Sequence, residues 1–208
     1  MSAPDALAAA RTEAPADVPL LATTINPFGD VAHQRRCFLA WRALGCEPVT
    51  LNSADEASSL VATGFASEDI LTVEAAETGL ALFGKAMPRV MPALARLAAA
   101  NGERTVILVN ADIYPAARHG EVVRFWRAEA PAVGLTREDC TLLEAHTLLD
   151  SRPYRNGLDA FLFRPGVLAR VIEALAAHAV SERLCFGIPG GEFRMGAVVR
   201  APAIGGRL

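Results

Sequence analysis

Val106-Ile107-Leu108-Val109, followed directly by Asn110-Ala111-Asp112-Ile113, is the most informative stretch of this chain. Four apolar residues in a row, three of them β-branched, predict a strand that is buried on both faces, and hence a central strand of a parallel sheet. The apolar run stops at Asn110. Ligands of open α/β sheets bind beyond the carboxyl ends of the strands, so we expect Asp112 to point into a crevice.

Two interpretations of Asp112 follow from the local sequence. A carboxylate at a strand end suits a hard divalent cation that carries a substrate phosphate. Alternatively, Asn110 and Asp112 form an Asx-type turn that only ends the strand. A motif this short leaves both interpretations open.

The composition favours one globular domain. A chain of 208 residues allows a single domain with a sizeable core. The balance of 20 basic and 23 acidic residues gives a net charge of −3, which points to neither nucleic acid nor an anionic membrane surface. No apolar run approaches the roughly 18 residues that span a bilayer. Asp5, Arg11 and Glu13 interrupt the N-terminal segment, so we do not expect a signal peptide.

Four cysteines, Cys37, Cys46, Cys140 and Cys185, are dispersed without a C-x-x-C spacing. This pattern gives little support to a zinc site or a disulfide framework. We expect free thiols in a reducing cytosol, and therefore a cytoplasmic protein. Nineteen of the twenty basic residues are arginine, and the only lysine is Lys85, which indicates either a specific role or chance.

The first half of the chain alternates between predicted strands and helices. Strands are expected at residues 18–24, 48–51, 70–73 and 106–109, and helices at 31–44, 54–61 and about 90–100. Asp30 is placed to cap the first helix, and Gly45 to end it. This spacing predicts βαβ units, and hence an α/β fold with a mainly parallel central sheet flanked by helices.

The second half of the chain is less regular. We expect a helix-like segment at 121–128, a loop with proline and glycine, a strand within 140–149, a strand at 158–163 and a helix opened by Pro165. Residues 1–17 are typical of a disordered arm, residues 18–200 of a single domain, and residues 201–208 of a C-terminal tail.

Four stretches of the chain resemble a known family when their order is considered. They are Leu21-Ala22-Thr23-Thr24-Ile25-Asn26 with Gln34-Arg35-Arg36, Val49-Thr50-Leu51-Asn52-Ser53, Val106 to Ile113, and Gly157-Leu158-Asp159-Ala160-Phe161-Leu162-Phe163 with Phe186-Gly187-Ile188-Pro189. Their order resembles the Rossmann-like GT-A fold of nucleotide-diphospho-sugar transferases. More narrowly, it resembles a group of mostly uncharacterised bacterial GT-A-like proteins.

This resemblance implies roles for residues at the strand ends. Asn110-Ala111-Asp112 resembles the Asp-x-Asp metal motif, so Asp112 would hold Mn²⁺ or Mg²⁺ against the diphosphate, with Asn110 beside the ribose or the metal. The first carboxylate of that motif is missing here, which lowers the expected metal affinity. By the same resemblance, the nucleotide pocket would be lined by Thr23, Thr24, Asn26 and Asn52, and Lys85 or Arg36 would supply a cation for the phosphates.

Two carboxylates are candidates for catalysis, Asp159 and Glu192. Asp159 lies in an apolar strand, where a buried carboxylate requires a partner. It is therefore either a site residue or half of an ion pair with an arginine such as Arg155. Glu192 follows two glycines where the family has aromatic residues and an aspartate. It is either a base or metal ligand, or a solvated loop charge.

The sequence is consistent with two functions. The first is a cytoplasmic glycosyltransferase that moves a sugar from a nucleoside diphosphate-sugar to an acceptor of unknown identity. The second is a non-catalytic GT-A-like module that binds a nucleotide or a partner protein. The missing aspartate and the missing aromatic platform favour the second, and a homo-oligomer is compatible with either.

Overall fold

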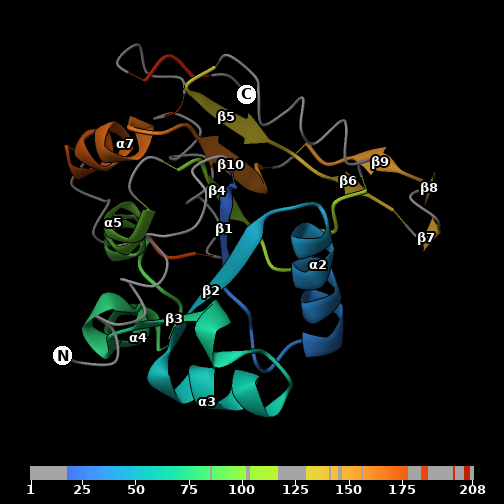
Figure 1. Cartoon of the computed structure of the whole chain (residues 1–208), viewed down its shortest axis with the longest axis horizontal. Coiled ribbons are helices and arrows are strands. Elements are labelled where there is room, and N and C mark those ends of the chain that lie inside the picture. The colour runs from blue at the N-terminus through green and yellow to red at the C-terminus, as the bar shows by residue number, and fades with distance from the viewer. Residues whose placement is uncertain are drawn as a thin grey trace.

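The computed structural model describes residues 18–84, 86–101, 104–116, 130–140, 142–144, 147–155, 157–177, 184–186, 199 and 204–206. A six-stranded sheet lies at the centre, with helices packed against both of its faces (Figure 1). The predicted α/β fold with a mainly parallel sheet is confirmed.

The strand order in this sheet is β3-β2-β1-β4-β10-β5. The strands are β1 (Leu20–Thr23), β2 (Glu47–Ser53), β3 (Ile70–Val73), β4 (Val106–Val109), β5 (Ala132–Leu135) and β10 (Ala160–Phe163). β1 pairs in parallel with β2 and β4, and β2 pairs in parallel with β3. β10 runs antiparallel to both of its neighbours, β4 and β5. All four residues of β4 are buried, as the apolar run predicted.

Helices cover the sheet on both sides. Alternate residues of β1 point to opposite faces: Leu20 belongs to the core under α5 (Val90–Asn101) and α7 (Val167–Ala176), and Leu21 to the core on the other face. α2 (Val31–Ala43) and α3 (Ala54–Ala62) pack on that second face (Figure 1), and Phe38 and Leu60 of these helices belong to one core cluster.

The helices that follow β1 and β2 start and end as expected. Asp30 caps α2, because its Oδ1 accepts a hydrogen bond of 2.9 Å from the backbone N–H of His33. Gly45 follows the end of α2 with φ of 89°, a conformation that favours glycine. Ser53 and Glu56 form a capping box at the start of α3, which fixes the turn directly after β2.

The largest differences from prediction lie in the second half. β5 occupies part of the stretch predicted as a loop, so that prediction is wrong for residues 132–135. Residues 140–149 were expected to hold one strand and instead contain β7 (Leu142–Glu144) paired antiparallel with β8 (Thr147–Leu149). A second small ladder joins β6 (Glu138–Asp139) to β9 (Arg152–Pro153), and α4 (Leu80–Phe83) is a short helix that was not predicted.

Several sequence predictions fall on residues that the structure does not describe, namely the arm at 1–17, the helix-like segment at 121–128 and most of the tail at 201–208. In the described part of the chain, no helix combines the length and the apolar character needed to cross a membrane.

Candidate functional site

The edge of the sheet at which β1, β2 and β4 end is called here the carboxyl edge. Parallel pairing brings these three ends together. β10 runs in the opposite direction, so it begins at this edge, and β5, antiparallel to β10, ends there. The described residues that this topology places at or directly beyond the edge include Thr23, Thr24, Asn26, Asn52, Asn110, Asp112, Arg137 and Asp159.

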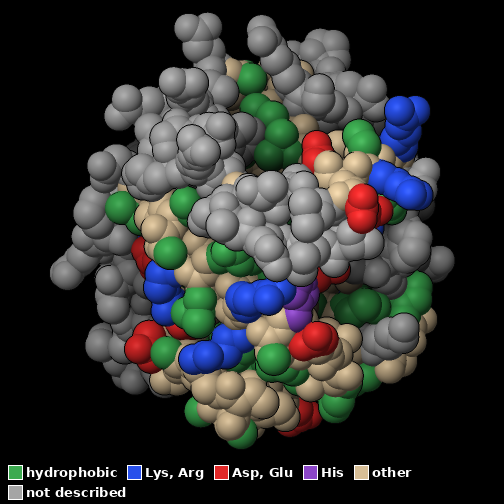
Figure 2. Space-filling model, turned by 90° about the vertical axis from the view of Figure 1, so that its right-hand side faces the viewer, with side chains coloured by type: hydrophobic (Ala, Val, Ile, Leu, Met, Phe, Trp, Pro, Cys, Tyr) green, Lys and Arg blue, Asp and Glu red, His purple; other side chains and the backbone are tan. Residues whose placement is uncertain are grey.

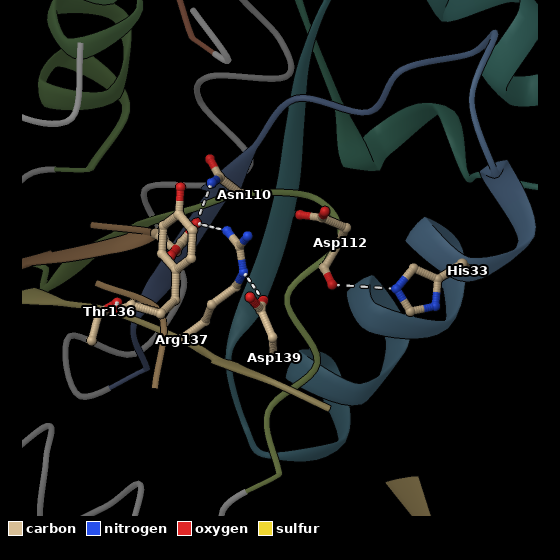
Figure 3. A network of polar contacts seen from close by, with 8 residues as sticks. His33, Asn110, Asp112, Thr136, Arg137 and Asp139 are labelled. Atoms are coloured by element: carbon tan, nitrogen blue, oxygen red, sulfur yellow. Dashed lines mark hydrogen bonds and ion pairs between the residues drawn. The ribbon is translucent and has the colours of Figure 1, made fainter. Parts of the chain in front are cut away.

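A polar network joins β4, β5 and β10 at the carboxyl edge (Figure 3). Asp159 Oδ1 accepts a hydrogen bond of 2.9 Å from Asn110 Nδ2 and forms an ion pair of 2.6 Å with Arg137 Nη1. The backbone is fixed on both sides as well, because Asn110 N–H donates to the carbonyl of Asp159 at 3.0 Å and Asp159 N–H donates to the carbonyl of Leu135 at 2.8 Å. Asp159 is therefore held through its main chain and one carboxylate oxygen.

Arg137 is the cation of this network. Its Nε lies 2.7 Å from Asp139 Oδ1, and its guanidinium carbon lies 3.8 Å from the ring centroid of Tyr154. Burial lowers the pKa of Arg137, but hydrogen bonds and charge from Asp139 and Asp159 outweigh burial and raise the pKa above its ordinary value. The guanidinium thus stays charged between two carboxylates and one aromatic ring.

The predicted alternatives for Asp159 are resolved in part. It is half of an ion pair, and it also lies at the carboxyl edge. The partner is Arg137 rather than Arg155, which is exposed. Sequence reasoning missed Arg137 because it follows a strand that was predicted as a loop. The available signal was indirect: a carboxylate in an apolar strand requires a nearby cation.

Three buried polar atoms near the edge lack a hydrogen-bond partner among the described residues. They are Asp159 Oδ2, Thr24 Oγ1 and Thr23 Oγ1. Asp159 is 6% exposed and Thr23 is 5% exposed. Buried polar atoms without partners are uncommon in folded proteins, and they indicate a bound group, a water or strain.

Asp112 is exposed in the loop after β4, and its carboxylate makes no hydrogen bond or ion pair with the described residues. The main chain of this loop is fastened to α2. His33 Nε2 lies 3.3 Å from the carbonyl of Asp112, and Trp41 Nε1 donates at 3.0 Å to the carbonyl of Ile113. The helix therefore holds the loop by its backbone and leaves the Asp112 carboxylate to solvent.

Arg36, a predicted phosphate contact, is exposed on α2 beside the same loop. Its Nη2 lies 3.0 Å from His33 Nδ1, and its guanidinium carbon lies 6.0 Å from the ring centroid of Tyr114. A guanidinium can only donate, so this contact makes His33 Nδ1 an acceptor and assigns the proton to Nε2, which faces the carbonyl of Asp112. On the face of the molecule that carries α2, a histidine side chain lies among arginine and acidic side chains (Figure 2).

Cys37 lies beneath this loop and is not a nucleophile candidate. Its Sγ lies 3.6 Å from His33 Nε2. Burial raises the pKa of the Cys37 thiol to about 11; the charge of Arg36 lowers it, and that of Asp112 raises it. A thiol with so high a pKa is protonated near neutral pH and reacts slowly.

The loop after β1 is held by Gln34 of α2. Asn26 N–H donates to Gln34 Oε1 at 2.8 Å, and Gln34 Nε2 donates back to the carbonyl of Asn26 at 3.1 Å. Gln34 is 7% exposed, whereas Asn26 is exposed, and Asn26 Oδ1 accepts from the N–H of Phe28 at 3.0 Å. The predicted ligand residue Asn26 thus lies on an ordered loop with an Asx-type turn.

Asn52 differs from Asn26 because it is completely buried. Its Oδ1 accepts from Thr50 Oγ1 at 2.6 Å, and its Nδ2 donates to the carbonyl of Ile25 at 2.8 Å and to Glu56 Oε2 at 2.9 Å. All of the hydrogens on its amide are therefore used within the chain. In this structure Asn52 orders the loop after β1, and its predicted contact with a nucleotide stays a prediction.

Lys85 and Glu192 lie outside the described residues, as do Gly187, Ile188 and Pro189. Among the described residues, no three histidine, cysteine or acidic side chains are grouped as a metal would require. A cation carried by a diphosphate fits the single carboxylate of Asp112, because Mg²⁺ commonly takes one or two carboxylates together with substrate phosphates and waters.

In the comparison with known proteins, no family model and no curated protein matches this chain.

Proposed function

We propose that this chain binds a nucleoside diphosphate-sugar at the carboxyl edge and acts as a glycosyltransferase of the GT-A type. The observation that carries the proposal is the placement of two exposed polar residues, Asn26 and Asp112, on ordered loops at the same sheet edge. Ligands of open α/β sheets bind at this edge. The order of the elements also resembles the GT-A fold, although a fold alone does not fix a function.

The proposed ligand spans the edge in a fixed direction. Asn26 follows β1, Asp112 follows β4, and Asp159 precedes β10, so the strand order places Asp112 between the other two. A diphosphate at Asp112 would leave the nucleoside toward β1 and β2 and the sugar toward β10. Arg36 lies beside the Asp112 loop, because it contacts His33 and Tyr114.

Asp112 would hold Mn²⁺ or Mg²⁺ together with the phosphates, and the metal would supply charge neutralisation of the leaving diphosphate. The chain itself positions the metal ligand, because α2 holds the main chain at Asp112 and Ile113 while the Asp112 carboxylate stays accessible. The free thiols, one of them exposed at Cys140, support a reducing compartment and hence a cytoplasmic location.

One observation favours the second candidate, a non-catalytic nucleotide-binding module. Asp159 uses Oδ1 to hold Arg137 and Asn110, which is a structural role, and the other candidate base, Glu192, lies outside the described residues. Both candidate functions use the same nucleotide site, but only the glycosyltransferase turns the donor over. Release of nucleoside diphosphate from the bound donor, measured over time, therefore distinguishes the enzyme from the binding module.

The test is a melting-temperature panel of UDP, GDP, CDP and dTDP with and without Mn²⁺. We expect one nucleotide to raise the melting temperature only when Mn²⁺ is present. Asp112→Ala should abolish that rise and change the free energy of unfolding without ligand by no more than about 0.5 kcal/mol, because the side chain is exposed.

Glu173→Ala, which removes an exposed carboxylate from α7, is the matched control and should keep the full response. A panel with no response, or an equal response in Asp112→Ala and the unmodified chain, would refute the proposed site.

A further inference from the structure

Asp159 presents one carboxylate oxygen that the described chain leaves unused. The side chain is 5% exposed, and its Oδ1 takes both Arg137 Nη1 at 2.6 Å and Asn110 Nδ2 at 2.9 Å. Its Oδ2 is buried without a hydrogen-bond partner among the described residues. Because Oδ1 is fixed by two donors and the backbone by two further hydrogen bonds, the carboxylate cannot turn to satisfy Oδ2 without breaking contacts.

The charge of Asp159 is already balanced. Arg137 carries the positive charge that faces Asp159, and the second carboxylate on this guanidinium, Asp139, is 57% exposed and solvated. A second cation at Oδ2 is therefore unnecessary, and a phosphate there would meet a negative oxygen. A carboxylate oxygen only accepts hydrogen bonds, so the group that satisfies it is a neutral O–H or N–H donor.

Thr24 adds a second unpartnered group on the same face of the sheet. Ala22, Leu108 and Phe161 all belong to the core under α5 and α7. Thr24 directly follows β1 and Asp159 directly precedes β10, and we infer their face by continuing the alternation of side chains one residue past each strand end. β4 separates their strands, which puts the two backbones about 10 Å apart at the usual strand spacing. The Thr24 hydroxyl is buried without a partner among the described residues.

We infer that Asp159 Oδ2 accepts a hydrogen bond from a hydroxyl group of the sugar, and that the Thr24 hydroxyl contributes a weaker contact to the same ligand. This inference rests on the proposed function, because it assigns the sugar end of the donor to the side of the carboxyl edge formed by β10. Asp159 is then a binding residue that determines which sugar is accepted. In this role Oδ2 receives a hydrogen bond from the donor sugar and does not take the proton of the acceptor.

The experiment compares the affinity of each nucleoside diphosphate with that of its glucose or mannose conjugate, by calorimetry with Mn²⁺. UDP, GDP, CDP and dTDP and their sugar conjugates are the probes. The affinity ratio is the Kd of the nucleoside diphosphate divided by the Kd of its sugar conjugate. It isolates the contribution of the sugar to binding.

Asp159→Asn should lower the affinity ratio about tenfold, in line with the loss of a hydrogen bond to a charged acceptor, and should leave the affinity for the nucleoside diphosphate within about twofold. Glu138→Gln is the matched control. It removes an exposed carboxylate on β6 that lies outside the polar network, and it should keep both affinities.

Thr24→Val is a second test that does not disturb the ion pair. It replaces a buried unpartnered hydroxyl by a methyl group of similar shape, so the variant should fold as well as the unmodified chain. We expect a smaller fall in the same ratio, about threefold, as for a neutral hydrogen bond.

The outcomes separate the two proposals. If no nucleotide binds, the proposed function and this inference fail together. If nucleotides bind and both Asp159→Asn and Thr24→Val keep the ratio of the unmodified chain, only the inference is overturned, and Oδ2 is satisfied by an internal water.

Discussion

The indole N–H of Trp41 donates a hydrogen bond of 3.0 Å to the backbone carbonyl of Ile113, which is 72 positions further along the chain. Together with His33, which contacts the carbonyl of Asp112 at 3.3 Å, it attaches the loop after β4 to α2. α2 also holds the loop after β1 through Gln34. One helix therefore positions both loops that carry the exposed candidate ligand residues.

Trp41→Phe should loosen the loop after β4 while keeping most of the apolar packing of the ring. The lost hydrogen bond should lower the free energy of unfolding by about 1 kcal/mol, measured by urea denaturation. Amide hydrogen exchange should accelerate at residues 110–114 and stay unchanged in α5, which packs on the opposite face of the sheet. Uniformly faster exchange throughout the chain would contradict a local role.

Asn52→Leu should destabilise the protein strongly although it removes no charge. The substitution leaves the carbonyl of Ile25 without its side-chain donor and the Thr50 hydroxyl without its acceptor in a completely buried site, where that hydroxyl keeps only the hydrogen bond that it accepts from the N–H of Ile25. We expect a loss of about 3 kcal/mol in the free energy of unfolding. Ser58→Ala, which removes an exposed hydroxyl on α3, should change it by no more than about 0.5 kcal/mol. Equal effects of the two substitutions would show that the buried network is dispensable.

Arg104→Met should destabilise the protein without affecting ligand binding. Arg104 is 6% exposed, donates from Nε to the carbonyl of Val18 at 2.9 Å, and lies 2.7 Å from Glu47 Oε2. It precedes β4, so it acts at the edge opposite the candidate site. We expect a loss of about 2 kcal/mol, less than for a fully buried pair because the Glu47 side chain is 29% exposed.

Glu47→Gln should lower the free energy of unfolding, measured by urea denaturation, by less than Arg104→Met does. Nucleotide affinity should be the same in both variants as in the unmodified chain. If either variant changed nucleotide affinity without changing stability, the Arg104–Glu47 pair would act on the candidate site, which contradicts its placement at the opposite edge of the sheet.

Stability should fall at high pH, in part through Cys46. Burial raises the pKa of this thiol from 9.0 to about 12 in the folded protein. Below pH 9 both the folded and the unfolded thiol are protonated, so Cys46 adds no pH dependence there. Above pH 9 only the unfolded thiol ionises, so unfolding becomes easier as pH rises toward 12, by up to about 1.4 kcal/mol per pH unit.

Urea denaturation at several pH values from 8 to 11 measures this slope. Cys46→Ala should give a shallower decline above pH 9 than the unmodified chain. Cys140→Ala, at an exposed cysteine, is the control and should keep the original slope. Identical slopes in all three proteins would refute the role of Cys46.

Local sequence signals predicted the first half of the fold well. β3 (Ile70–Val73) was predicted at its observed residues, and the caps at Asp30 and Gly45 were predicted with the correct chemistry. These features depend on neighbours along the chain. β5 was missed because its four residues, Ala132-Val133-Gly134-Leu135, contain a glycine and no alternation of polar and apolar residues. Among the described strands it pairs only with β10.

The candidate site could be predicted only where a strand end marks it. Asp112 and Asn26 follow strands that the sequence predicts, and both are exposed. The burial of Asn52 and the pairing of Arg137 with Asp159 depend on which strands are neighbours. Arg137 and Asp159 are 22 positions apart, a separation with no pattern along the chain. Such contacts follow from sheet topology rather than from spacing.

The reversed direction of β10 has a consequence for the order of folding. β1, β2, β3 and β4 can associate through successive crossover units, because each pairs in parallel with a neighbour from the first 109 residues. The Asn110–Asp159 contact instead closes a loop of 49 residues, which makes it entropically slow to form. The loops after β1 and β4 should therefore form early in folding, and the contacts of β10 should form late. A folding intermediate with a protected β1–β4 unit would present Asp112 before Asp159 has reached its place.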